Sequence, residues 1–177
     1  MSWIATATGG RFYFDERLSP EHVRFQDIAI ALSNICRWTG QISNHYSVAE
    51  HSWHCSYLVP PQWALCALLH DATEGYCNDL ARPLKRTLPD YMAAEDRIWR
   101  EAIAPAFDLP EKLPDCVKAA DTAMLKREAQ QFYPKELADD IAIPGPAADV
   151  NLHMWDPYYS RFYFVRRYLE LTGKVTP

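Results

Sequence analysis

The sequence lacks the features that mark secreted, membrane-spanning and disulfide-bonded proteins. Its five cysteines are odd in number and include no Cys-x-x-Cys pair, which argues against a disulfide framework and a zinc ribbon. The longest uncharged apolar stretch, near residues 58–69, contains two prolines and is shorter than the roughly 18–20 residues that span a bilayer. The N-terminus has no basic start followed by a long apolar run. We therefore expect a cytoplasmic protein without a membrane segment or signal peptide.

An excess of positive charge is also missing. The 18 Lys and Arg residues are outnumbered by 23 Asp and Glu residues, which gives a formal net charge of −5. This balance argues against binding to a nucleic-acid polymer, because such binding needs a basic surface. A chain of 177 residues fits one domain over 1–177 and can bury a core without disulfides or structural metal. We therefore expect any bound metal ion to serve function rather than folding.

Strand-like alternation is scarce, and apolar residues recur instead every three or four positions between the prolines. This pattern predicts an all-α fold. The exception is the aromatic run over 11–14, which can form one arm of a short N-terminal β-hairpin. Ser47 and Glu50 have the spacing of a capping box at a helix start. The predicted helices lie after Pro20 to about Trp38, from Ser47, and over 62–75, 91–105, 116–132 and 156–171, with a loop over 139–150.

The predicted helix over 62–75 is apolar on all sides, which is typical of a central buried helix. It carries His70 and Asp71 near its end, with Glu74 one turn later, so a continuous helix would direct all three toward one side. Burying a carboxylate is costly unless it is paired or bound to a cation. A metal ion would satisfy both His70 and Asp71.

Two further polar residues share helix faces with apolar ones. Asp121 lies four residues from both Val117 and Leu125, and His51 shares a face with Val48. A histidine on such a face is more often a hydrogen-bonded core residue, and that alternative stays open for His51 alone. Together, two imidazoles and two carboxylates suit a divalent ion and leave positions for water or substrate.

Four separated segments closely resemble the HD-domain phosphohydrolases: SVAEHS at 47–52, LLHDATE at 68–74, DLARPLK at 79–85 and VKAAD at 117–121. The nearest groups are the YfbR-type 5'-deoxynucleotidases and the small phage and bacterial HD-domain nucleotide phosphohydrolases. The resemblance implies an HD-domain helical bundle that acts on a small-molecule nucleotide, in the host cytoplasm if a phage encodes it. It also implies a divalent ion (Co, Mn, Zn or Mg) bound by His51, His70, Asp71 and Asp121, with Glu74 and Asp79 in catalysis.

The implied reaction removes phosphate by attack of a metal-activated water, for which Glu74 and Asp79 supply acid–base catalysis in an order that the sequence leaves open. Arg37 and Trp38 match the family's pair that contacts the nucleotide. Lys85 and Lys118 are further candidates to neutralise phosphate, whereas Arg82 and Arg86 are predicted to be surface residues.

Three alternatives remain open from the sequence. The chain can be a deoxynucleoside triphosphate phosphohydrolase, acting for example on dATP, which would use the same metal centre. It can instead be a nucleotide sensor without turnover, or a zinc-stabilised domain. The zinc alternative rests on two pairs spaced four residues apart, His51 with Cys55 and Cys66 with His70. The aromatic run over 155–169 is a helix face for core packing or subunit packing, which leaves a homo-oligomer possible.

Overall fold

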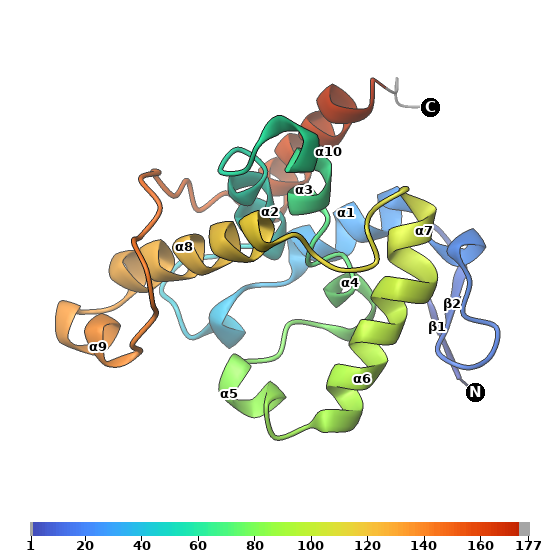
Figure 1. Ribbon diagram of the computed structural model, residues 1–177, viewed down its shortest axis with the longest axis horizontal. Helices are drawn as coiled ribbons and strands as arrows, with labels where there is room; N and C mark the ends of the chain where they lie inside the picture. Colours follow the sequence, from blue (N-terminus) through green and yellow to red (C-terminus); the bar gives the residue numbers. More distant parts are fainter. Residues whose placement is uncertain (1, 174–177) are drawn as a thin grey trace.

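Helices make up most of the protein, and a small antiparallel sheet lies at its N-terminal end (Figure 1). This computed structural model describes residues 2–173. In the sheet, Ile4 lies opposite Phe12. The predicted mostly helical fold and the N-terminal hairpin are therefore confirmed. The elements are β1 (Trp3–Ala5), β2 (Arg11–Tyr13), η1 (Pro20–His22), α1 (Phe25–Asn34), η2 (Trp38–Gly40), α2 (Val48–Cys55), η3 (Pro61–Trp63), α3 (Ala64–Leu68), α4 (Glu74–Cys77), α5 (Arg82–Lys85), α6 (Pro89–Ile98), η4 (Trp99–Ile103), α7 (Ala104–Ala106), α8 (Asp115–Phe132), α9 (Lys135–Asp140) and α10 (Pro157–Thr172).

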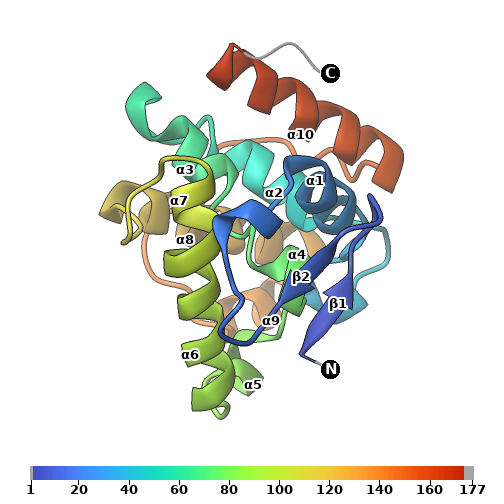
Figure 2. The ribbon, with the colours of Figure 1, turned by 90° about the vertical axis from the view of Figure 1, so that its right-hand side faces the viewer.

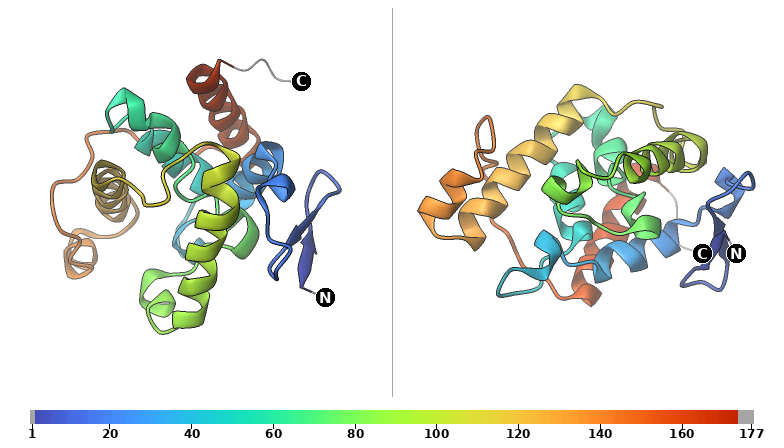
Figure 3. Two further views of the ribbon diagram at one scale, coloured as in Figure 1. Left: turned by 45° about the vertical axis from the view of Figure 1, so that its right-hand side comes forward. Right: turned by 90° about the horizontal axis from the view of Figure 1, so that it is seen from below.

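Helix α2 is the centre of the fold. It packs against α1, α3, α8 and α10, and the views in Figures 2 and 3 show these helices around it. Ser47 caps the helix, since its hydroxyl accepts a hydrogen bond from the Glu50 N–H at 3.0 Å, as the sequence predicts. The Glu50 carboxylate does not return to Ser47. It accepts hydrogen bonds from the backbone N–H groups of residues 153, 154 and 155, and so ties the segment before α10 to α2.

The first helix ends earlier than predicted. Helix α1 stops at Asn34, and the following backbone is extended rather than helical up to Trp38. The reason is tertiary, because this extended segment bonds to the segment before α2: Val48 N–H donates to the Ile35 carbonyl and Arg37 N–H to the Tyr46 carbonyl. Arg37 and Trp38 therefore lie in a loop that is held against the start of α2.

The predicted continuous helix over 62–75 is wrong. The structure has η3 and α3, then a turn over 69–73, then α4. In the turn, Ala72 N–H donates to the Leu69 carbonyl and Glu74 N–H to the Asp71 carbonyl, which is tighter than helical i→i+4 bonding. The chain thus changes direction at His70 and Asp71.

The second half of the chain contains the three predicted helices with shifted ends and one short helix, α9, that was not predicted. Between α6 and α7 the helix widens into the π-helical turn η4, where Ala104 N–H bonds to the Trp99 carbonyl. Pro105 explains the widening, because it has no N–H to donate to Glu101 in a regular helix. Helices α8 and α10 match their predictions within a residue, while α9 reaches Asp140 and shortens the predicted loop.

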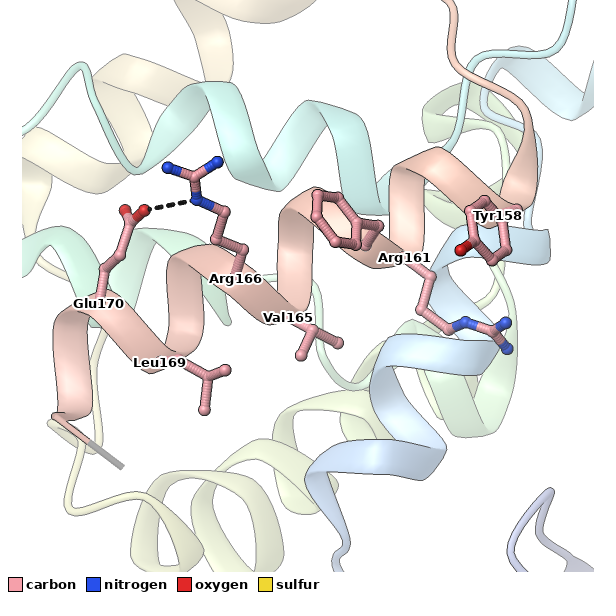
Figure 4. Close-up of a pocket in the computed structure, with 7 residues that line it drawn as sticks. Tyr158, Arg161, Val165, Arg166, Leu169 and Glu170 are labelled. Carbon is pink, nitrogen blue, oxygen red and sulfur yellow. Dashed lines mark hydrogen bonds and ion pairs between the residues drawn. The ribbon is translucent and has the colours of Figure 1, made fainter. Parts of the chain in front are cut away.

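Helix α10 turns one aromatic face inward and another outward. Phe25 stacks on Tyr168 with ring centroids 3.7 Å apart, and Phe164 is fully buried nearby. The opposite side, drawn in Figure 4, is a shallow hollow of about 520 Å³ lined by α10 residues, with Tyr158 and Phe162 exposed. None of its residues belongs to the predicted metal or nucleotide site. In the described part of the chain, no helix is both long and apolar enough to cross a membrane.

Candidate metal centre

The four predicted metal ligands come together from three parts of the fold. His51 lies in the middle of α2, His70 and Asp71 in the turn after α3, and Asp121 in the second turn of α8. His51 Nε2 is 3.3 Å from Asp121 Oδ1 and 3.7 Å from Asp71 Oδ2, and His70 Nε2 is 3.2 Å from Asp71 Oδ2. Two ligand atoms that are each about 2.1 Å from one ion lie roughly 3.0–3.5 Å apart. The separations of 3.2 and 3.3 Å lie within that range, and the separation of 3.7 Å lies just above it.

The orientation of the His51 ring is set by Glu128, a residue of α8. His51 Nδ1 lies 2.6 Å from Glu128 Oε1, and both side chains are fully buried. A carboxylate accepts hydrogen bonds, so it favours the proton on Nδ1 and leaves the Nε2 lone pair of the neutral ring toward the cluster. A carboxylate behind a ligating histidine is a recurrent arrangement in metal sites.

His70 has the same orientation by a different contact. Its Nδ1 lies 2.8 Å from the Ala67 carbonyl, which can only accept a hydrogen bond. Its Nε2 is buried and has no hydrogen-bond partner. Two imidazole lone pairs and two carboxylates therefore face one another in a largely buried space, and a cation is the group that would satisfy them together.

A cysteine completes the cluster. The fully buried Cys55 places its Sγ 3.5 Å from His51 Nε2. The ligand atoms of His51, Cys55 and His70 all lie within 4.8 Å of one another, so this buried group could hold a metal ion. Cys66, the second cysteine of the zinc alternative, is not part of the group. The donor set of nitrogen, sulfur and oxygen atoms suits a borderline divalent ion.

The electrostatics of the cluster favour positive charge. Burial and the Arg37 guanidinium oppose protonation of His51, but Cys55, Glu128 and Asp121 outweigh them and raise the pKa of His51 well above its usual value. For Asp121, burial acts upward, yet His51, His70 and Arg37 hold the pKa of its carboxyl group far below the ordinary value. In the metal-free protein these groups favour a proton on His51 Nε2 beside Asp121, and a bound cation would take the place of that proton.

Glu74 and Asp79 lie beside the cluster but outside its shortest contacts. Glu74 begins α4, is buried, and its Oε2 has no hydrogen-bond partner. Burial, together with the charges of Asp71 and Asp79, raises the pKa of Glu74 well above its usual value. Burial also raises the pKa of Asp79, against the opposing effect of Arg37. Burial thus makes the charged form of both carboxyl groups less favourable than it is in water.

The Arg37–Trp38 loop is tied to the back of the centre. Arg37 Nε and Trp38 Nε1 each donate to Glu128 Oε2 at 3.1 Å, and an Arg37 terminal nitrogen lies 3.6 Å from Asp71 Oδ2. Trp38 and Thr39 have φ angles of +57° and +51°, which non-glycine residues adopt at a cost of about 1–3 kcal/mol each. Residues strained in this way cluster at active sites and ligand-binding segments.

The other cations differ in their contacts. Arg82 is a surface residue, as predicted, and its half-exposed side chain also donates to Asp121 Oδ2 at 3.3 Å. Lys85 forms an ion pair with Glu95 and Lys118 pairs with Asp115 at 3.4 Å. Lys118 is on the exposed side of α8, away from the contacts that join the cluster. The substrate-binding roles of both lysines stay predictions.

Two bacterial proteins are similar in sequence to this chain. No family model matches it. It is 47% identical to the uncharacterized protein YfdR of Escherichia coli (strain K12) over 132 residues, which cover 75% of this chain and 73% of YfdR. The chain belongs to the family of YfdR. The chain is also similar to the uncharacterized protein RCAP_rcc00048 of Rhodobacter capsulatus, with 36% identity over 128 residues, which cover 64% of this chain and 65% of that protein.

Glu128 belongs to the site, but the sequence pattern did not predict it. It lies seven residues after Asp121, two helical turns along the same face of α8. A second carboxylate at that spacing from a candidate ligand is a usable signal, but it becomes specific only when His51 is known to face it.

Proposed function

We propose that the protein is a metal-dependent phosphohydrolase of (deoxy)nucleotides, and that it removes phosphate from 5'-deoxynucleotides. The observation that carries the proposal is that the Nε2 atoms of His51 and His70 converge with the carboxylates of Asp71 and Asp121. Of these groups, the buried His70 Nε2 has no hydrogen-bond partner, and a bound cation would satisfy it. The four segments that resemble the HD-domain phosphohydrolases supply these same residues.

Each residue of the centre would have a distinct role. His51, His70, Asp71 and Asp121 would hold a divalent ion, with Glu128 and the Ala67 carbonyl orienting the two rings. When bound, such an ion lowers the pKa of water and polarises a phosphoryl oxygen. Glu74 and Asp79, whose pKa values burial raises, would carry the protons that move to and from the reacting oxygens.

Arg82 would bind phosphate at the mouth of the centre. Arg37 already bonds to Glu128 and Lys85 to Glu95, so these cations are partly committed. Arg82 uses one amino group toward Asp121, and its other N–H donors have no partner in the described part of the chain. A guanidinium with spare donors is suited to bind phosphate oxygens in pairs.

A second candidate, a deoxynucleoside triphosphate phosphohydrolase, is favoured by one observation. Arg82 and Lys85 are the first and last residues of the short helix α5, so two cations lie on one helix, although Lys85 is already paired with Glu95. A longer phosphate chain would find more positive charge there than a monophosphate requires.

A substrate panel tests both candidates. Deoxy- and ribonucleoside monophosphates and triphosphates are incubated with the protein and Mn²⁺, Co²⁺, Mg²⁺ or Zn²⁺, and the released products are separated. Release of inorganic phosphate from deoxynucleoside monophosphates supports the proposal. Release of triphosphate or successive phosphates from a deoxynucleoside triphosphate favours the second candidate. No turnover of any nucleotide by metal-loaded protein contradicts both.

A further inference from the structure

Cys55 is fully buried in the hydrophobic core, and its sulfur also lies against an imidazole nitrogen of the centre. It lies one helical turn after His51 on α2, so the two side chains project from the same face of the helix. Its Sγ lies 3.5 Å from His51 Nε2, the atom whose lone pair faces the cluster. The contact to this nitrogen comes in addition to the packing of Cys55 in the hydrophobic core.

The distance itself matches shared coordination. Protein ligands bind zinc-like ions at about 2.0–2.1 Å through histidine nitrogen and about 2.3 Å through cysteine sulfur, so bond angles of about 90° to 109° place the two atoms roughly 3.1–3.6 Å apart. The separation between Cys55 Sγ and His51 Nε2 is 3.5 Å.

His70 supplies an independent observation. Its Nε2 is buried and makes no hydrogen bond, although the Asp71 carboxylate lies 3.2 Å away. A ring nitrogen of His70 lies within 4.8 Å of the Cys55 sulfur and of a His51 nitrogen. Three donors from two different segments thus surround one point, and Asp71 and Asp121 approach the same two imidazoles.

We propose that Cys55 is a further ligand of the metal ion, and that its sulfur makes the centre selective for thiophilic divalent ions such as Zn²⁺ and Co²⁺ over Mg²⁺ and Mn²⁺. The inference rests on the proposed metal centre. On binding, the S–H bond breaks, the sulfur–metal bond forms, and the proton leaves to the solvent. Thiolate sulfur is a soft ligand that Mg²⁺ and Mn²⁺ bind poorly, whereas carboxylates alone would not discriminate in this way.

Absorption spectroscopy of the cobalt-loaded protein tests the inference without relying on activity. Cobalt bound in a protein site has visible d–d bands, and a cobalt–sulfur bond adds a charge-transfer band in the near ultraviolet. We expect both in the wild-type protein. Cys55→Ala and Cys55→Ser should keep the visible bands and lose the near-ultraviolet band. Using two variants keeps the test valid if circular dichroism shows that one of them fails to fold.

Cys66→Ala is the matched control, because Cys66 is also a buried cysteine but is outside the cluster. It should retain both sets of bands. A wild-type spectrum with visible bands but no sulfur band, or a sulfur band that persists without Cys55, overturns the role of Cys55 and leaves the metal centre standing. Failure of the wild-type protein to bind Co²⁺ at all contradicts the metal centre and, with it, this inference.

Competition between metals gives a second readout. The ratio of Zn²⁺ affinity to Mn²⁺ affinity should fall in the Cys55 variants and stay unchanged in Cys66→Ala. An unchanged ratio in folded Cys55→Ala contradicts the claim that sulfur sets the metal preference.

Discussion

His51 and Glu128 form a fully buried pair in which Nδ1 and Oε1 are 2.6 Å apart. Through this pair α8 contributes twice to the centre, because Asp121 of the same helix approaches the other nitrogen of the His51 ring. Glu128 also accepts from Arg37 and Trp38, and the positive groups around it keep the pKa of its carboxyl group below the ordinary value although burial acts upward. One side chain thus couples the ring orientation to the Arg37–Trp38 loop.

Glu128→Gln should weaken metal binding without removing any predicted ligand. The amide no longer holds the proton on His51 Nδ1 as a carboxylate does, and loss of such a partner lowers metal affinity by about 10–100-fold. Cobalt titration measures the affinity, and circular dichroism checks the fold. Glu136→Gln, an exposed change on α9, is the control. Unchanged affinity in Glu128→Gln would show that the ring does not depend on this carboxylate.

Glu74→Gln should stabilise the metal-free protein at high pH. The pKa of Glu74 is raised above its ordinary value of 4.5 by burial and by Asp71 and Asp79. A raised folded-state pKa means that the contribution to stability is complete below pH 4.5 and is lost as the pH rises through the folded-state pKa. The melting temperature of Glu74→Gln should exceed that of the wild type at about pH 8, and the two should converge toward about pH 4.

The comparison uses thermal unfolding in the presence of a chelator. A difference in melting temperature that does not change with pH would contradict the account of Glu74. The same variant, when loaded with metal, should lose turnover by about 100-fold or more, as expected for an acid–base group. A loss of bound metal in Glu74→Gln would instead make Glu74 a ligand.

Arg82→Ala should raise KM for the nucleotide, with a larger effect for triphosphates than for monophosphates. We expect a change of about tenfold, the effect of losing one hydrogen bond between charged groups. Arg86→Ala is the matched control, because Arg86 is exposed one turn further along and has no side-chain contact to the centre among the described residues. Equal effects of the two variants would show that Arg82 acts only through the general charge of the surface and does not bind phosphate directly.

Trp38 has two separable roles. Its indole N–H bonds to Glu128, and its ring is only partly buried and can stack on a base or sugar. Trp38→Phe keeps a ring and loses the N–H, whereas Trp38→Ala loses both. Trp38→Ala should weaken nucleotide binding by roughly 1–3 kcal/mol more than Trp38→Phe does, the range for base stacking. With p-nitrophenyl phosphate, which has no base, the two variants should behave alike; a loss of the same size there contradicts stacking.

The sequence predicts the helical class and the convergence of the metal ligands better than it predicts local geometry. Ser47 is recognisable as a cap because the cap bond is local to residues 47–50. The break after Leu68 is not recognisable from the sequence, because the apolar pattern over 62–69 continues into the turn and no glycine or proline marks the end of the helix. Glu50 looked like half of a capping box, but its carboxylate binds backbone groups about 100 residues away, which no local pattern reveals.

The contacts of Cys55 and Glu128 show the same limit. Their spacings from His51 and Asp121 are visible along single helices, but their importance depends on α2 packing against α8. Arg82 reaches Asp121 only because α5 and α8, 39 residues apart at the contact, lie together.

The central claim is that His51, His70, Asp71 and Asp121 bind one divalent ion. The direct measurement is the metal content of the protein after loading with Co²⁺ or Zn²⁺ and removal of free metal, for the wild type, Asp71→Ala and the exposed control Asp115→Ala. We predict one ion per chain in the wild type and in Asp115→Ala, and no bound ion in Asp71→Ala that circular dichroism shows to be folded. One ion per chain in folded Asp71→Ala, or no ion in the wild type, would contradict the account.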